Sequence, residues 1–282
     1  MIIKPQSKIK DNENGLYIVS TPIGNLRDIT LRAIEILKQS DFILCEDTRI
    51  SKNLLNKYKI QSKLISNHKF NEKKNTLKII EYLKLGKIIS LISDAGTPGI
   101  SDPGALLVKY CIENQISVQI LPGVSAITAF ISGTGKQINE FYFGGFMSRK
   151  INDIRNKVIE CIDRSTIGIW FESPKRILKT VELIQDLYPN LEIVCAKELT
   201  KPYETYFRGI SVDVYQNLKH FDLRGEWIFL IDGSSIAIDE SDKLKQYSIQ
   251  FEKIGLTGKQ VKAVAEMFGL PKNKLYQEFK AL

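Results

Sequence analysis

A loop dense in glycine, proline and aspartate follows an apolar run near residue 91. Residues 91–104 read Leu-Ile-Ser-Asp-Ala-Gly-Thr-Pro-Gly-Ile-Ser-Asp-Pro-Gly, with neither lysine nor arginine among them. A phosphate group favours helix-terminal amides with cationic help, whereas this stretch supplies two carboxylates, Asp94 and Asp102. The loop therefore favours a ligand that carries a positive or hydroxyl-bearing group over a nucleoside triphosphate. We expect 102–104 (Asp-Pro-Gly) only to turn the chain into the next helix.

Three similar loops follow other predicted strands of the first half, at residues 21–26, 46–49 and 121–126. In open α/β sheets, ligands bind at the carboxyl ends of the strands, so the loops that follow strands are the places to look. Glycine and proline in one such loop are ordinary turn chemistry. Four such loops at one end of a sheet predict a ligand site.

Two nucleotide-binding sequence motifs are absent, and their absence narrows the class of ligand. Gly-x-Gly-x-x-Gly does not occur, and the Gly-Thr-Gly-Lys at 133–136 lacks the first glycine and the final Ser/Thr of a phosphate-binding loop. Asp94 and the backbone of Ala95 and Gly96 suit a ligand with an amino group, a ribose or a positive centre. S-adenosylmethionine has all three, although the pattern is not unique to it.

Metal and thiol chemistry have little support. His68 and His220 are far apart in the sequence, so we assign no metal ligand, and only a magnesium site made of Asp and Glu stays open. The four cysteines match no disulfide or zinc spacing, and we expect free, buried thiols in a reducing compartment. No apolar run has the length of a membrane span. We therefore expect a cytoplasmic protein without a membrane partner.

The elements that position these loops follow from hydrophobic patterning. Strands are predicted at 16–20, 42–45, 88–93 and 118–121 in the first half, and at 141–143, 167–171, 192–196 and 227–231 in the second. Amphipathic helices are predicted between them, with Ile29, Ala33, Ile36 and Leu37 on the apolar face of one and Leu77, Ile80 and Leu83 on that of another. Further helices are predicted at 153–162 and 175–187. This alternation predicts an α/β fold with parallel or mostly parallel strands in its first sheet.

We divide the chain into a first α/β domain (1–124), a second α/β domain (125–235) and a helical tail (236–282). In the tail we expect a polar helix over 239–253, then two short helices about Gly269 that resemble a helix-turn-helix, the first capped by Thr257 and Gln260. Val261, Val264, Ala265 and Phe268 share one face of it. From 241 to 282, eight Lys stand against four Asp or Glu. RNA binding and a packing or dimer role are equally favoured.

The overall charge is also basic, at +8 with a pI of about 9.1. Such a balance attracts polyanions, including nucleic acid and anionic lipid. Lysine, isoleucine and asparagine are abundant throughout the chain, however, so the charge favours a nucleic-acid partner only modestly.

Taken together, the loops resemble the ribosomal RNA methyltransferase branch of the tetrapyrrole methylase-like enzymes. The motifs that carry this resemblance lie at 16–30, 45–49, 93–98 with 102–104, 121–126, 171–174, 196–201 and 225–226, and the helical residues 261–279 add to it. The chain departs at 68–72, His-Lys-Phe-Asn-Glu, where Phe70 replaces a second histidine. Nearly the whole chain is covered.

The resemblance implies two α/β domains with S-adenosylmethionine in the cleft between them, a small helical extension and a homodimer. It places the cofactor-binding residues at Pro22, Asp94, Ala95, Gly96, Thr97, Pro98, Ser125 and Ala126, with a later contribution from the second domain. It also implies 2′-O-methylation of a cytidine in small-subunit (16S) ribosomal RNA, with naked RNA or the small ribosomal subunit as the partner.

A ribose hydroxyl is a weak nucleophile, so a general base would help methyl transfer. Glu46, Asp47 and Glu198 are the candidates, each predicted at the end of a strand. Each also suits a helix cap or an ion pair with Arg49 or Lys197, and Arg49 suits either an RNA phosphate or Asp47. We rank Glu46 and Asp47 above Glu198.

Two rival functions stay open. A tetrapyrrole methylase would act without RNA and would show no salt-sensitive RNA affinity. A non-catalytic RNA-binding or assembly factor with the same fold would bind RNA without regard to the cofactor, and the cofactor would not raise its melting temperature.

Overall fold

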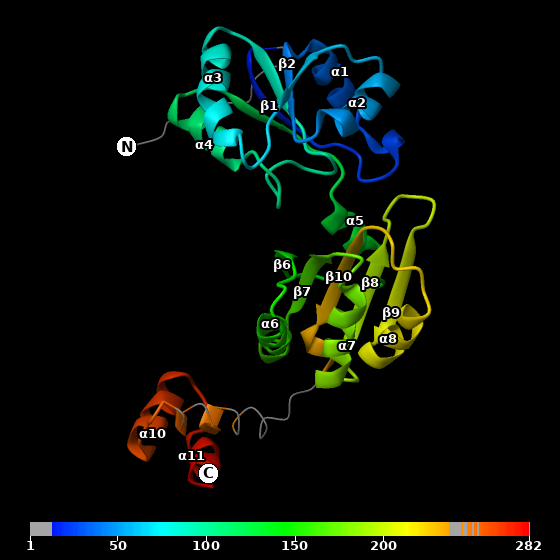
Figure 1. The fold of residues 1–282 in the computed structure, drawn as a ribbon. Coiled ribbons are helices and arrows are strands. Elements are labelled where there is room, and N and C mark those ends of the chain that lie inside the picture. Colours follow the sequence, from blue (N-terminus) through cyan, green and yellow to red (C-terminus); the bar gives the residue numbers. More distant parts are fainter. Residues whose placement is uncertain (1–12, 237–243, 245–246, 250, 253, 282) are drawn as a thin grey trace.

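The computed structural model describes residues 13–236, 244, 247–249, 251–252 and 254–281. Most of the helix predicted over 239–253 lies outside the described residues. Two five-stranded sheets, each covered by helices, make up residues 15–235 (Figure 1). Within the described ranges, no helix has the length and apolar character needed to cross a membrane.

The first sheet is wholly parallel, with strand order β3-β2-β4-β1-β5. Its strands are β1 (Gly15–Val19), β2 (Phe42–Cys45), β3 (Lys63–Ser66), β4 (Ile88–Leu91) and β5 (Val118–Leu121). Side chains alternate across β1: Tyr17 and Val19 pack with helices α1 (Leu31–Gln39) and α2 (Thr48–Lys57). Leu16 and Ile18 pack with α3 (Glu72–Lys84) and α4 (Ala105–Glu113) on the other face. Both faces are thus buried, as a parallel sheet requires.

The second sheet is mixed, with order β6-β7-β10-β8-β9: β6 pairs with β7 in parallel, and the other three neighbouring pairs are antiparallel. Its strands are β6 (Phe141–Phe146), β7 (Ile167–Glu172), β8 (Glu192–Lys197), β9 (Thr205–Ile210) and β10 (Trp227–Asp232). One face carries α6 (Ile151–Asp163), α7 (Ile177–Leu187) and α8 (Ser211–Lys219). The other face packs against Phe130 of α5 (Ala126–Gly133) and against Ile23 from the loop after β1. Ile23 therefore joins the two sheets.

The tail forms a small core of its own. Helices α10 (Gly258–Met267) and α11 (Lys272–Lys280) bury Val261, Ala265 and Leu275 together with Leu244. The predicted cap is present, since the Thr257 N–H donates to Gln260 Oε1 at 2.8 Å. Phe268, expected on the same face as Val261, is 67% exposed.

All eight predicted strands are confirmed within a few residues, and two strands were missed. The missed strands, β3 and β9, lie at sheet edges and lack a continuous apolar run. The placement of Leu77 on the buried face of α3 was wrong. Thr76, Ile79, Ile80 and Leu83 form that face, and Leu77 is 63% exposed. The four cysteines are free and buried, as expected.

Candidate active site between the two domains

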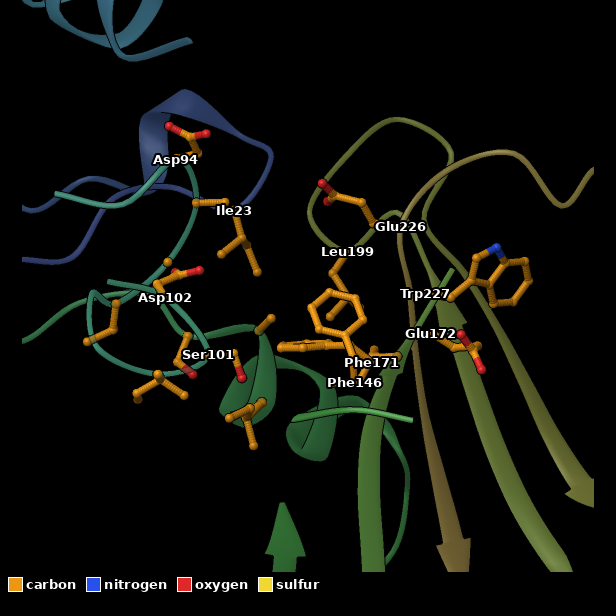
Figure 2. Close-up of a pocket in the computed structure, with 18 of the residues that line it drawn as sticks. Ile23, Asp94, Ser101, Asp102, Phe146, Phe171, Glu172, Leu199, Glu226 and Trp227 are labelled. Atoms are coloured by element: carbon orange, nitrogen blue, oxygen red, sulfur yellow. The ribbon is translucent and has the colours of Figure 1, made fainter. Parts of the chain in front are cut away.

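A cavity of about 400 Å³ lies between the two α/β domains, and we call it the interdomain pocket. Figure 2 shows Ile23, Asp94 and Asp102 from first-domain loops on one side and Phe146, Phe171 and Leu199 from the second domain on the other. Its volume falls within the roughly 300–1,000 Å³ usual for small-molecule sites. The lining residues are Ile23, 94–97, 100–102, 125–127, Phe146, 171–174, Leu199 and 225–228.

The loop after β4 owes its shape to a two-residue bridge with the loop after β1. The Thr21 N–H donates to the Gly96 carbonyl (2.8 Å), and the Gly96 N–H donates to the Thr21 carbonyl (3.0 Å). Gly96 has a φ of +79°, a conformation in which a side chain causes strain. Because both backbone groups of Gly96 are engaged, it shapes the wall and leaves no free amide for a ligand.

Asp94 is placed at the first-domain wall by a neighbouring backbone. Its Oδ1 accepts the Asp47 N–H at 3.1 Å, which ties the loop after β4 to the loop after β2. Burial raises the pKa of Asp94, and the nearby Asp47 carboxylate adds to the rise. A cation in the pocket would relieve this cost, because it would favour the charged carboxylate.

The second-domain wall is held by a buried carboxylate. Glu172 pairs with the Arg176 guanidinium and also accepts hydrogen bonds from the Ser173 N–H (2.7 Å) and the Thr180 hydroxyl (2.8 Å). Arg176 in turn donates to the carbonyls of Met147 and Ser148. This network fixes the segment that carries Phe171 and the loop after β6. The charge of Glu172 is therefore balanced by Arg176, and Glu172 helps to fix the shape of the pocket.

The two domains meet at a close backbone contact beside the pocket. The Asn25 N–H donates to Thr200 Oγ1 at 3.1 Å. A Cβ on Gly24 would lie 2.8 Å from the Leu199 carbonyl oxygen and 2.5 Å from Lys201 Cγ. Only glycine fits there without displacing the second-domain loop, so this contact sets how closely the domains approach.

A second cavity, which we call the side pocket, adjoins the first. It is lined by Glu46, 68–70, Glu72 and 101–103, and it shares Ser101 and Asp102 with the interdomain pocket. Burial, together with the charges of Asp102 and Asp94, raises the pKa of Glu46 to about 7. Burial and the charge of Asp94 also raise the pKa of Asp102. Three carboxylates therefore border the junction of the two pockets.

The fold brings most of the predicted cofactor residues together. Asp94, Ala95, Gly96, Thr97, Ser125 and Ala126 line the interdomain pocket. Pro22 and Pro98 are buried and do not line it. Among the described residues that line this pocket, none is Lys or Arg. The segment at 125–127 begins α5, whose first amides lack intrahelical partners.

The four candidate catalytic residues are not brought together. Glu46 lines the side pocket. Asp47 instead caps α2, accepting the Arg49 N–H (2.8 Å), and pairs with the exposed Arg49 guanidinium, which lowers the pKa of Asp47 to about 2. Glu198 pairs with Lys201 and accepts the Glu226 N–H. The alternative role of a cap and ion pair therefore describes Asp47, and Glu198 forms an ion pair with Lys201 in place of the expected Lys197.

Sequence reasoning missed several lining residues. Asp102, expected only to turn the chain, also lines both pockets, so that expectation was too narrow. The second-domain residues 171–174 and 225–226 belong to motifs of the resembled family, and that signal pointed to them. Leu199 also lies within one of those motifs, at 196–201, whereas Phe146 carried no signal, because only the packing of the domains brings it to the pocket. No group of three or more His, Cys, Asp or Glu side chains in the described ranges is arranged to hold a metal.

Comparison with solved structures bears on the fold. Cobalt precorrin-4 methyltransferase matches with a TM-score of 0.58 at 16% identity, covering 79% of this chain and 96% of that one. Diphthine synthase matches with a TM-score of 0.56 at 14% identity, covering 77% and 88%. Both likenesses show the shared two-domain α/β fold.

Comparison of sequences shows closer relatives. The chain is 44% identical to a Mesomycoplasma conjunctivae protein named Ribosomal RNA small subunit methyltransferase I, over 83% of this chain and 97% of that protein. It is 36% identical to the Bacillus subtilis protein of the same name, over 94% and 93%. The family model described as Tetrapyrrole (Corrin/Porphyrin) Methylases matches residues 15–211. The chain therefore belongs to the tetrapyrrole methylase family.

Proposed function

We propose that the chain is an S-adenosylmethionine-dependent methyltransferase that methylates the 2′-hydroxyl of a cytidine in small-subunit (16S) ribosomal RNA. The observation that carries this proposal is the nearly full-length similarity to proteins named Ribosomal RNA small subunit methyltransferase I, at up to 44% identity. Those names supply the class of RNA. The cytidine and its 2′-hydroxyl come from the resemblance of the loop motifs.

The interdomain pocket supports S-adenosylmethionine as the cofactor. Asp94 and Asp102 supply negative charge for a ligand with a sulfonium and an ammonium group. Ile23, Ile127 and Leu199 supply apolar surface, and the first turn of α5 supplies amides for a carboxylate. This combination of one acidic wall, apolar surface and a helix N-terminus suits a ligand with charges of both signs.

When bound, S-adenosylmethionine supplies a methyl group on a positively charged sulfur, already activated for attack. The protein's own work is to align the acceptor with that methyl group and to exclude water. The contact of Gly24 and Asn25 with the loop at 199–201 holds the two walls of the interdomain pocket in place relative to each other.

Glu46 is the carboxylate we propose as the general base. It borders the side pocket, and its pKa of about 7 suits proton transfer near neutral pH. In this role Glu46 accepts the proton of the ribose hydroxyl as the oxygen gains the methyl group. Asp47 positions Asp94 and α2, and Glu198 positions residues 225–226 beside the pocket.

We further propose that the protein is a homodimer that acts in the cytoplasm. Support for a dimer comes from exposed apolar side chains on edge strands: Phe141 and Tyr142 of β6 and Ile120 of β5. Exposed edges of this kind favour pairing or covering by another chain. Light scattering should give the mass of two chains, and the mass of one chain would contradict the dimer.

The proposed function is tested with methyl-labelled cofactor and small subunits from cells that lack this modification. Label should enter the RNA, and the cofactor should raise the melting temperature of the protein. Comparison of intact subunits with naked RNA identifies the preferred substrate. Label-free RNA in both reactions would contradict the proposal, and label on a tetrapyrrole would favour the rival activity.

A further inference from the structure

Phe70 presents an aromatic ring to solvent at the edge of the side pocket. It is 93% exposed, the most exposed of the large hydrophobic side chains that the structure describes. A single exposed apolar side chain is common on protein surfaces and implies nothing by itself. The surroundings of Phe70, however, point to a ligand.

The turn that carries Phe70 is held by a set of hydrogen bonds. The His68 N–H donates to Asn71 Oδ1 (2.7 Å), and the Phe70 N–H donates to His68 Nδ1 (3.3 Å). Asn71 and Asn75 both donate from Nδ2 to the Ser66 carbonyl, which anchors the turn to the end of β3. These hydrogen bonds therefore fix the backbone from which the Phe70 ring projects.

The aromatic rings of His68 and Phe70 lie next to each other at the side pocket. The rings of His68 and Phe70 lie 6.0 Å apart at 65°. Lys69, Lys73 and Lys74 are exposed on the same turn and on the first turn of α3. An aromatic face among lysines is the surface chemistry that binds an unpaired base and its flanking phosphates.

The side pocket, which Phe70 borders, lies next to the interdomain pocket. Its volume, about 720 Å³, is large enough for a nucleotide. It shares Ser101 and Asp102 with the interdomain pocket, and it also contains Glu46. A methyl acceptor in the side pocket would therefore lie next to a donor in the interdomain pocket.

We propose that Phe70 stacks on the unpaired base of the nucleotide whose ribose is methylated. The ribose then lies toward Ser101 and Asp102, and Lys69, Lys73 and Lys74 meet the neighbouring phosphates. This inference rests on the proposed function and assigns its acceptor-binding surface. It makes Phe70 a substrate-binding residue, with no part in cofactor binding.

Two substitutions of Phe70 separate the ring from its apolar bulk. Phe70→Leu keeps an apolar side chain and loses the aromatic face, whereas Phe70→Tyr keeps the face. Base–aromatic stacking contributes at least ~1 kcal/mol, which is about five-fold. Phe70→Leu should therefore lower kcat/KM for undermethylated subunits about five-fold or more, and Phe70→Tyr should stay within about two-fold of the wild type.

Three controls accompany these kinetics. Leu85→Ala alters an exposed apolar side chain at the far end of α3 and should leave kcat/KM unchanged. The melting temperature and the cofactor Kd of Phe70→Leu should equal those of the wild type.

Equal kcat/KM for Phe70→Leu and the wild type would overturn the inference alone. A change of oligomeric mass in Phe70→Leu would overturn it in favour of a contact between copies, and an inactive wild type would overturn the proposed function together with the inference.

Discussion

At the scale of single residues, Glu46 differs from the other candidate bases in what surrounds its carboxyl group. Arg49 pairs with Asp47, and Lys201 pairs with Glu198, so both carboxylates are held in the charged form. Glu46 instead lies near Asp94 and Asp102, and its pKa rises to about 7. Partial burial, together with the like charges of the two aspartates, thus allows this carboxyl group to take up a proton near neutral pH.

Glu46→Gln tests this role. General-base catalysis contributes roughly 10²- to 10⁴-fold, so we expect kcat to fall by about that range while the cofactor Kd changes little. In the wild type, kcat should rise with pH through about 7, since Glu46 must lose its proton before it can accept another. Glu46→Gln should lose that rise. Asp47→Asn is the matched control and should keep it, and a wild-type pH profile in Glu46→Gln would exclude Glu46 as the base.

The same pKa has a consequence for stability. The folded protein binds the Glu46 proton up to pH about 7, whereas an unperturbed Glu loses it near 4.5. The free energy of unfolding should therefore fall as pH rises from about 4.5 to about 7, because the folded state binds more protons in that window. Denaturant unfolding at pH 5 and pH 8 should show a smaller fall for Glu46→Gln.

Asp94 provides a test of the acidic wall. Asp94→Ala should raise the Kd for S-adenosylmethionine about ten-fold or more, because a hydrogen bond to a charged group contributes ~1.5–3 kcal/mol. Calorimetry measures it directly. Asp94→Asn keeps an acceptor for the Asp47 N–H while it removes the charge, so it separates loop anchoring from attraction to the cation. An unchanged Kd in both variants would contradict the assignment.

The sequence allowed Asp94 to be singled out, because an aspartate in a glycine-rich loop without lysine is a local signal. The raised pKa of Glu46 had no local signal. It depends on burial in the fold and on Asp102 and Asp94, which lie about fifty residues further along the chain and approach Glu46 through the pairing of β2 with β4. Charge clustering of this kind follows from tertiary structure and not from spacing.

At the scale of elements, the bridge between Thr21 and Gly96 shapes the pocket wall. Gly96→Ala places a Cβ 3.4 Å from Ile23 Cγ2 in a left-handed conformation (φ +79°). We expect a loss of ~1–2 kcal/mol in the free energy of unfolding and weaker cofactor binding. Denaturant unfolding and calorimetry measure the two effects.

Gly99→Ala is the matched control for Gly96→Ala. Gly99 has a similar φ (+83°), but a Cβ there would meet nothing within 4 Å. The backbone strain should therefore be similar, while the cofactor Kd should stay at the wild-type value. If the two variants weaken cofactor binding equally, the bridge at Gly96 has no particular role in the pocket.

The elements that sequence reasoning found and missed differ in their patterning. Buried inner strands such as β1 and β10 consist almost entirely of apolar residues, and they were predicted to within one residue at each end. β3 (Lys-Leu-Ile-Ser) and β9 (Thr-Tyr-Phe-Arg-Gly-Ile) lie at edges and keep polar residues in the strand. In α3, Ile80 and Leu83 lie on the buried face as predicted, whereas Leu77 lies outside it and Thr76 and Ile79 complete it. Short or one-sided periodicity leaves such choices open until packing decides them.

At the scale of the whole molecule, the tail has a small apolar core of its own. Leu244, Val261, Ala265 and Leu275 form a core that shares no residue with the cores of the two α/β domains. This tail also carries eight Lys against four acidic residues between 241 and 282. The tail is therefore a basic helical unit whose core is separate from those of the two α/β domains.

Deletion of residues 241–282 should therefore weaken RNA binding more than cofactor binding. Removing phosphate contacts should also make RNA affinity less dependent on salt. Filter binding across a salt series measures the RNA affinity and its salt dependence, and calorimetry measures the cofactor Kd. Full-length RNA affinity in the truncated chain would make the tail a packing or dimer element, the other role that the sequence left open.

In the proposed reaction the methyl group is placed on the ribose of a cytidine in small-subunit ribosomal RNA. The most direct measurement digests RNA from treated, previously undermethylated subunits to nucleosides and analyses them by mass spectrometry. We predict 2′-O-methylcytidine that depends on both the protein and S-adenosylmethionine, and its loss with Asp94→Ala at limiting cofactor. A methyl group on a base, or no methylated nucleoside at all, would contradict the account.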